Sequence, residues 1–131
     1  MKFVKSIAVI FASSLAFCAS STAFADEVLE EFVCTFNHGK TMDDLMKVVD
    51  QWKEVMEDIK SGKDYQAWIL TPIASDHMTS VIWMGQIPDM EAFGRLEAEY
   101  GVSEAGQVMD VKFDEVLTCH SRSIWRMKKV R

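Results

Sequence analysis

Hydrophobic residues in this chain follow two different spacings, and the order of these spacings limits the possible folds more than any other feature. Four segments have the period of two that indicates β-strands, at 27–37, 65–71, 79–87 and 117–126. Two segments have the spacing of amphipathic helices, at 41–61 and 88–101, and a further helical stretch follows at 103–116. The chain therefore predicts the order β-α-β-β-α-β, with the second helical region split in two.

The first helix has the clearest boundaries. Thr41 offers a hydroxyl acceptor at the N-cap, and Asp43 and Asp44 place negative charge in the first turn, where the helix dipole favours it. The apolar stripe that follows ends near Ser61 and Gly62. This segment predicts one long amphipathic helix after the first strand.

The second and third predicted strands are apolar on both faces. In the strand at 65–71, Trp68 and Leu70 point one way while Ala67 and Ile69 point the other. The following strand, with Trp83 at its centre, has the same pattern. A sheet with one solvated face would alternate apolar and polar residues, so we expect both faces to be covered.

This element order is that of the ferredoxin-like fold, an α+β arrangement with a four-stranded antiparallel sheet. In it, the last strand lies antiparallel beside the first strand, at the edge of the sheet. Residues 26–131 are enough for one modest core and contain no interdomain linker, so a single domain is expected.

The N-terminus predicts export. Lys2 and Lys5 precede an apolar run at 7–17, and Ala23-Phe24-Ala25 matches a cleavage site, as in a secretory signal peptide of residues 1–25. The apolar run is short for a membrane span, although an uncleaved anchor is the alternative. We expect a periplasmic or secreted protein, cleaved after Ala25, with no transmembrane anchor in the mature chain.

The mature chain is acidic. Loss of Lys2 and Lys5 lowers the formal net charge from −6 to −8. Proteins that bind nucleic acid present basic surfaces, so nucleic acid is not expected as a partner.

Cleavage leaves two of the three cysteines, Cys34 and Cys119. An even pair in an exported protein favours a disulfide, which would contribute about 4.5 kcal/mol by loop-closure entropy. Two free thiols or a thiolate metal site are the alternatives, but no Cys-x-x-Cys or other clustered ligand spacing supports metal. The predicted topology brings the end of the first strand to the start of the last, which agrees with the disulfide.

Strict alternation divides the last strand into two faces. One face carries Cys119, Ser121, Ser123 and Trp125. The other carries His120, Arg122, Ile124 and Arg126.

If Cys34 bonds Cys119, the face with His120, Arg122 and Arg126 lies away from the helices, near Asn37 and His38. Such a cluster would bind a carboxylate or phosphate through the arginine forks. The alternative is an edge strand whose charges prevent aggregation.

His38 and His120 are weak candidates for a catalytic base, and no third residue completes a metal site or a catalytic triad. We therefore expect no metal and no cofactor. Four tryptophans and nine methionines suggest a large, adaptable interior, in which Trp68 and Trp83 would line a pocket for a small apolar ligand. Ordinary core packing is the alternative explanation.

The element order, the split second helical region and the aromatic sheet resemble the dimeric α/β-barrel superfamily, which includes antibiotic-biosynthesis-type monooxygenases and related stress and binding proteins. The resemblance covers the whole mature chain and includes no diagnostic motif. It implies a homodimer in which two sheets pack face to face, with a ligand held between sheet and helices. It assigns no catalytic residue.

Three functional hypotheses follow. The first is an exported homodimer that binds a small molecule or a partner without catalysis. The second is a cofactor-independent monooxygenase or isomerase that uses His38 or His120 as its base. The third is a structural protein of the cell envelope.

Overall fold

The computed structural model describes residues 26–131, and the predicted signal peptide lies outside this range. The elements are β1 (Val28–Phe36), α1 (Met42–Asp58), a 3-10 turn (Lys60–Asp64), β2 (Gln66–Leu70), β3 (Ser80–Ile87), α2 (Met90–Val102), α3 (Glu104–Val116) and β4 (Leu117–Arg126). The predicted order and the split helical region are confirmed. None of the helices between residues 26 and 131 has the length and hydrophobicity that a membrane crossing requires.

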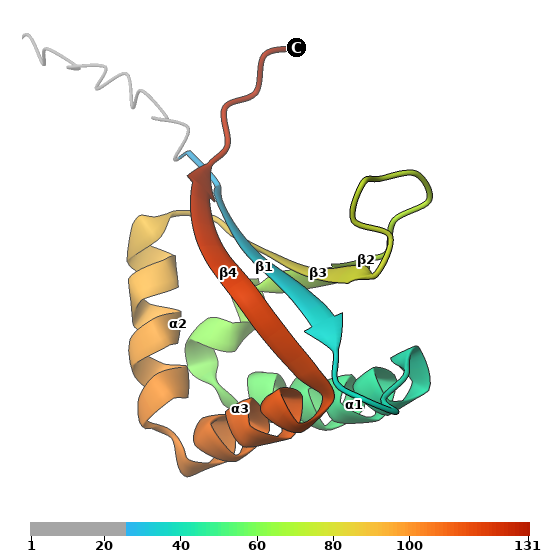
Figure 1. Ribbon diagram of the computed structural model, residues 1–131. Helices are drawn as coiled ribbons and strands as arrows, with labels where there is room; N and C mark the ends of the chain where they lie inside the picture. Colours follow the sequence, from blue (N-terminus) through green and yellow to red (C-terminus); the bar gives the residue numbers. More distant parts are fainter. Residues whose placement is uncertain (1–25) are drawn as a thin grey trace, which may run out of the picture.

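The four strands form one antiparallel sheet in the order β2-β3-β1-β4. This is the ferredoxin-like topology, with β4 beside β1 at one edge and β2 at the other (Figure 1). The split between α2 and α3 falls at Ser103, whose hydroxyl accepts a hydrogen bond from the Gly106 N–H and caps the N-terminus of α3.

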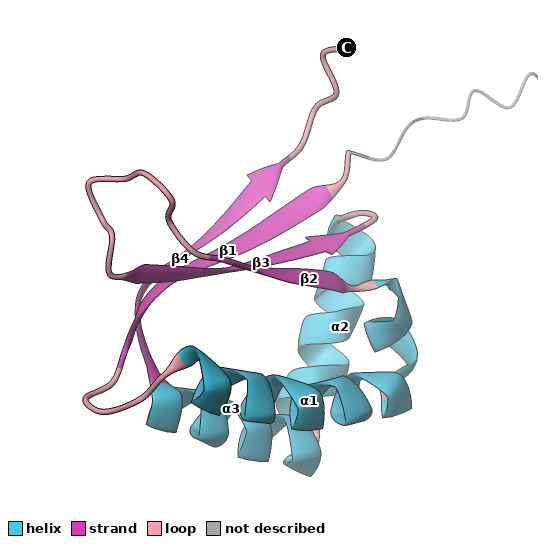
Figure 2. Ribbon diagram, turned by 90° about the vertical axis from the view of Figure 1, so that its right-hand side faces the viewer, coloured by secondary structure: helices cyan, strands magenta, loops and turns pink. Residues whose placement is uncertain are grey.

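Within residues 26–131, the helices all lie on one side of the sheet and leave the other side uncovered (Figure 2). At the start of α1, Thr41 and Asp44 form a capping box in which each side chain bonds the backbone N–H of the other. Leu45, Val48 and Val49 then recur at helical spacing and are buried. This stripe fixes which face of α1 meets the sheet.

Two clusters of buried side chains form the core between the helices and the sheet. One surrounds Cys34 and Leu45, and the other surrounds Val28 and Ile87. Trp52 of α1 packs against both clusters. The core therefore extends along β1 and β3, the two central strands.

A β-bulge changes which faces the residues of β4 occupy. Cys119 lies opposite Cys34, but Ser121 lies opposite Val33, so His120 is an extra residue between two registers. After the bulge, Arg122 lies opposite Phe32 on the helix-covered face, and Arg126 lies opposite Val28 on the same face. The prediction that Arg122 and Arg126 lie away from the helices was wrong, because strict alternation assumes an unbroken ladder.

The predicted disulfide joins Cys34 to Cys119. Cys34 is fully buried in the core, whereas Cys119 is exposed on the edge strand. The bond therefore ties β4 to the core at the position where the bulge interrupts its pairing with β1.

Candidate functional site

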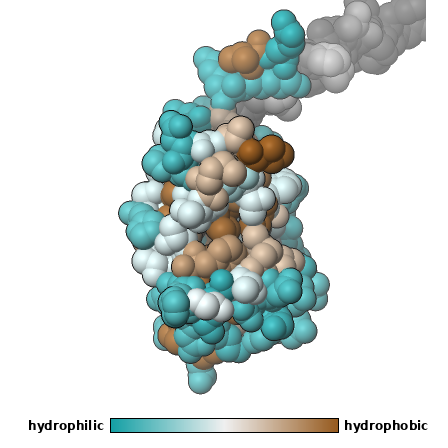
Figure 3. All heavy atoms as spheres, turned by 45° about the vertical axis from the view of Figure 1, so that its right-hand side comes forward, coloured by the Kyte–Doolittle hydropathy of each residue, from teal (hydrophilic) through white to brown (hydrophobic). Residues whose placement is uncertain are grey.

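The candidate site is a cavity of about 430 Å³ between α1 and the β2–β3 side of the sheet. This size lies within the range of small-molecule sites. Its lining is mainly apolar and aromatic, and consists of Met46, Val49, Trp52, Lys53, Tyr65, Ala67, Trp68, Ile69 and Trp83. Figure 3 looks toward the side of the molecule that carries α1 and β2, and hydrophobic residues gather there around a central hollow.

Three aromatic rings shape the cavity. Trp52 meets Trp83 edge to face, with ring centroids 4.9 Å apart and an interplanar angle of 88°. Trp52 also meets Tyr65 at 6.0 Å and 71°. Edge-to-face contacts favour fixed ring positions, so the aromatic walls are held in place before any ligand arrives.

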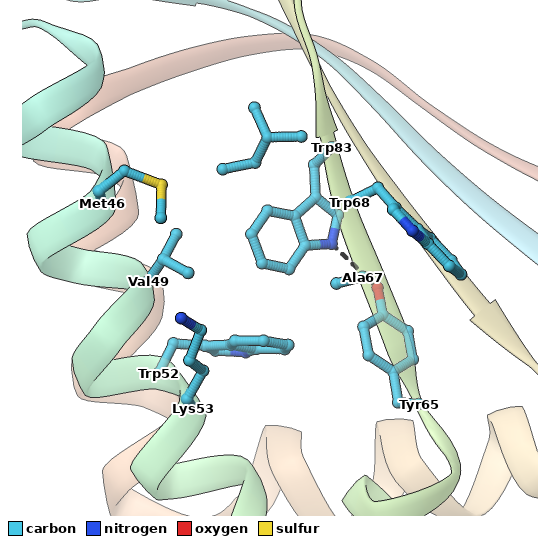
Figure 4. A pocket seen from close by; sticks show the side chains of 9 residues that line it. Met46, Val49, Trp52, Lys53, Tyr65, Ala67, Trp68 and Trp83 are labelled. Carbon is cyan, nitrogen blue, oxygen red and sulfur yellow. Dashed lines mark hydrogen bonds between the residues drawn. The ribbon is translucent and has the colours of Figure 1, made fainter.

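A chain of hydrogen bonds runs behind this aromatic wall. The Trp83 indole Nε1–H donates to the Tyr65 hydroxyl oxygen at 3.0 Å (Figure 4). The Tyr65 hydroxyl donates to Glu30 Oε2 at 2.9 Å. Arg122 Nε donates to Glu30 Oε1 at 2.7 Å, and the same guanidinium reaches Glu97 at 2.7 Å. The chain therefore links the cavity wall to an exposed ion pair.

Glu30 is the buried charge of this network, with 6% of its surface exposed. A buried carboxylate requires hydrogen bonds and a counter-charge, and here Tyr65 and Arg122 supply them. Burial, followed by the nearby Glu30 charge, raises the pKa of Tyr65 above its ordinary value. Tyr65 therefore keeps its proton and acts as a hydrogen-bond donor to Glu30.

Tyr65 can occupy this place because residue 85 is glycine. A Cβ atom on Gly85 would overlap the Tyr65 hydroxyl and the ring carbons next to it. The ring lies across β3 at this position, where a side chain would otherwise stand.

The two tryptophans that were predicted to line a pocket lie on opposite faces of the sheet. Trp83 stands on the helix-covered face and fills one wall of the cavity. Trp68 borders the cavity at β2, but its ring turns away from Trp52 and Trp83 (Figure 4). Trp68 pairs with Met84 and belongs to the uncovered face of the sheet, where it is 39% exposed.

The other predicted site residues are not gathered into one cluster. Asn37 bonds the Asp114 carbonyl and accepts a bond from Thr118. His120 bonds the Thr35 hydroxyl at 2.9 Å. Arg126 pairs with Asp26 at 3.6 Å.

Neither predicted histidine lines the cavity. His38 is exposed in the turn after β1, and His120 is exposed at the bulge. In the part of the chain that the structure describes, no three His, Cys, Asp or Glu side chains come together as metal ligands would.

Sequence reasoning missed Glu30, Tyr65 and Glu97. Glu30 did carry a signal, because it is the single acid on the otherwise apolar face of the first strand, between Val28 and Phe32. Such a residue must find a buried partner. The sequence does not identify that partner, since Arg122 is 92 positions away and lies on this face only because of the bulge.

Comparison with known proteins supports the fold. No family model and no curated protein matches the sequence. Among solved structures, the chain is similar to SnoaB, a cofactor-independent oxygenase from Streptomyces nogalater, with a TM-score of 0.59, 13% identity, and 81% of this chain and 97% of that chain covered. It is also similar to an uncharacterized NIPSNAP-like domain protein from Burkholderia xenovorans, with a TM-score of 0.60, 9% identity, and 81% and 89% covered.

A conserved protein from Methanosarcina mazei Go1 is more distant, with a TM-score of 0.52, 8% identity, and 78% of this chain and 93% of that chain covered. These likenesses extend over nearly the whole of each neighbour. They show the ferredoxin-like fold that the sequence predicted.

Proposed function

We propose that this protein is exported and binds a small apolar molecule in the cavity between α1 and the sheet, without chemical change to that molecule. The observation that carries the proposal is the preformed aromatic wall of Trp52, Tyr65 and Trp83 around about 430 Å³. In residues 26–131, every buried side-chain nitrogen and oxygen already has a hydrogen-bond partner. An apolar guest fits such an interior, because it leaves those bonds intact.

Filling the cavity is expected to abolish binding. Ala67 lies on the cavity side of β2, so Ala67→Phe would place a ring in the space without removing an existing contact. N-phenyl-1-naphthylamine, a neutral probe that fluoresces in apolar surroundings, should bind the unmodified protein and lose at least tenfold in affinity with Ala67→Phe.

Ala98→Phe provides the matched control, because Ala98 is exposed on α2 and lies outside the cavity lining. Equal probe binding by both variants would contradict the cavity as the site. If Ala67→Phe alone loses the probe, native mass spectrometry of protein purified from its own host would identify the natural ligand.

The protein is further proposed to be a homodimer that forms through the uncovered face of the sheet. This face mixes apolar and polar residues. Its polar members include Glu31, Gln86 and Ser123. Its apolar members are Leu29, Val33, Trp68, Leu70, Ile82, Met84 and Trp125. Trp68 and Trp125 are 39% and 52% exposed in the single chain. Exposed apolar side chains with polar neighbours are typical of interaction sites, and a second copy offers the same surface in return.

A charge on this face is expected to separate the dimer. Light scattering should give twice the monomer mass for the unmodified protein and the monomer mass for Trp68→Glu, because the interface would have to bury an unpaired carboxylate. Ile73→Glu is the control, since Ile73 is 96% exposed in the β2–β3 loop. A monodisperse monomer of the unmodified protein at high concentration would remove the dimer proposal.

A cofactor-independent oxygenase or isomerase is the second candidate. The specific observation that favours it is the Tyr65–Glu30 pair, which holds a polarised hydroxyl at the cavity wall. SnoaB, which has the same fold, is a cofactor-independent oxygenase. If the natural guest gains one oxygen atom and loses two hydrogen atoms when the complex is incubated in air, with the second oxygen atom of O2 leaving as water, catalysis replaces simple binding as the function.

A further inference from the structure

We infer that the cavity selects amphipathic anions, molecules with an apolar body and one carboxylate-like head group, and that Lys53 binds the head group. This inference rests on the proposed binding function and names the chemical class of its ligand. Lys53 is the one charged residue among those that line the cavity in the described part of the chain.

The position of Lys53 decides how such a ligand would lie. Lys53 follows Trp52 on α1, and its side chain runs along the α1 side of the cavity, opposite Tyr65 (Figure 4). The side chain is more than half exposed, so its ammonium group stands at the boundary between the cavity and water. A head group there would keep part of its hydration while the apolar body enters between the aromatic rings.

The opposite wall would reject an anion. Behind Tyr65 lies the buried Glu30 carboxylate, at 2.9 Å from the Tyr65 oxygen. The positive charge of Arg122 is already shared between Glu30 and Glu97. Among residues 26–131, no free cation lies on the inner wall, which leaves Lys53 as the partner for a negative head group.

The present partner of Lys53 is easily displaced. Lys53 Nζ lies 3.0 Å from Asp50 Oδ1, three residues earlier on the same helix, and both side chains are largely exposed. An exposed ion pair of this kind contributes little to stability, because water screens the two charges. A lysine ammonium also has three donors, so it can bind a ligand carboxylate while it still contacts Asp50.

The test compares two ligands with the same apolar body, 1-naphthylacetate with a charged head group and 1-naphthylacetamide with a neutral one of similar size. Each is measured by displacement of N-phenyl-1-naphthylamine. The unmodified protein should bind the acid about three- to fivefold more tightly than the amide, as expected for one partly exposed ion pair. Lys53→Met should bring this ratio close to one. Asp50→Asn should raise it, because the competing carboxylate is gone.

Lys47→Met is the matched control. Lys47 pairs with Asp44 at 3.4 Å with the same three-residue spacing on the same helix, but it does not line the cavity, so its loss should leave the ratio unchanged. An equal affinity for acid and amide in the unmodified protein, or a preference that survives Lys53→Met, would overturn this inference while the binding function stands. Failure of the neutral probe to bind at all would overturn the binding function itself.

Discussion

Replacing Glu30 with alanine is expected to lower the free energy of unfolding by about 3 kcal/mol, which combines an orphaned hydroxyl donor with a broken buried ion pair. Tyr65 would keep a buried O–H without an acceptor, and Arg122 would retain Glu97 alone. In a domain of this size, the midpoint of thermal unfolding should fall by on the order of 15 °C. Thermal and urea unfolding followed by circular dichroism would measure both quantities.

Glu97→Ala provides the comparison, because Glu97 binds the same guanidinium from the surface. The Glu97 side chain is 46% exposed and the Glu30 side chain 8%, so the surface pair should contribute less than about 1 kcal/mol. Equal losses of stability in Glu30→Ala and Glu97→Ala would show that the burial of Glu30 does not make its contribution to stability larger than that of Glu97. Glu30→Gln should fall between the two, since an amide can still accept the Tyr65 hydrogen bond.

Removal of the disulfide is expected to destabilise the protein by about 2–5 kcal/mol, because Cys34 and Cys119 close a long loop. The loss should appear first in β4, whose pairing with β1 is interrupted next to the bond. Hydrogen exchange in the Cys34→Ala/Cys119→Ala variant should therefore show faster exchange of the β4 amides than of the β3 amides, which lie within the sheet.

The reduced, unmodified protein separates the effect of the bond from the effect of the missing sulfur atoms. It keeps both thiols in place, so any further loss in the double alanine variant reports the small void beside buried Cys34. In the oxidised protein, the intact mass should be two hydrogens lower than that of the reduced chain. Labelling of both cysteines in the folded, untreated protein would contradict the bond.

Much of the fold was predictable because the signals are local and repeat along the chain. The spacing of Leu45, Val48 and Val49 predicts α1 without reference to any other segment. The Cys34–Cys119 pair then supplied a long-range contact between the first and last strands. The element order predicted the edge position of β4 through the ferredoxin-like topology, and the cysteine pair agreed with that topology independently.

The face of Arg122 was not predictable because it depends on a single inserted residue. His120 has no sequence signal that distinguishes a bulge from a regular position, and one extra residue reverses every later side chain of the strand. The predicted anion site failed to assemble for this reason. Arg122 instead neutralises Glu30, a role that required knowledge of both the bulge and the register of β1 with β4.

The sequence predicted that an aromatic cavity exists, but it did not predict most of the residues that line that cavity. An excess of tryptophan suggested an aromatic pocket, and Trp83 does line one. The choice between Trp68 and Trp83 required the layer order, since the helices cover one face of the sheet alone. Tyr65 lay at the start of the predicted second strand, but its contact with Glu30 depends on the packing of β2 against β3 and β1.

The close approach of Tyr65 to Gly85 has a consequence for how sequences with this site can diverge. A side chain at position 85 and a large ring at position 65 would occupy the same volume. A larger residue at position 85 is therefore harmful while Tyr65 is present, and a smaller residue at position 65 leaves a void while Gly85 is present. Sequences that keep the glycine can keep the tyrosine and its buried acid. Sequences that lose it must replace Tyr65 and Glu30 as well, and we expect substitutions at positions 30, 65 and 85 to be inherited together.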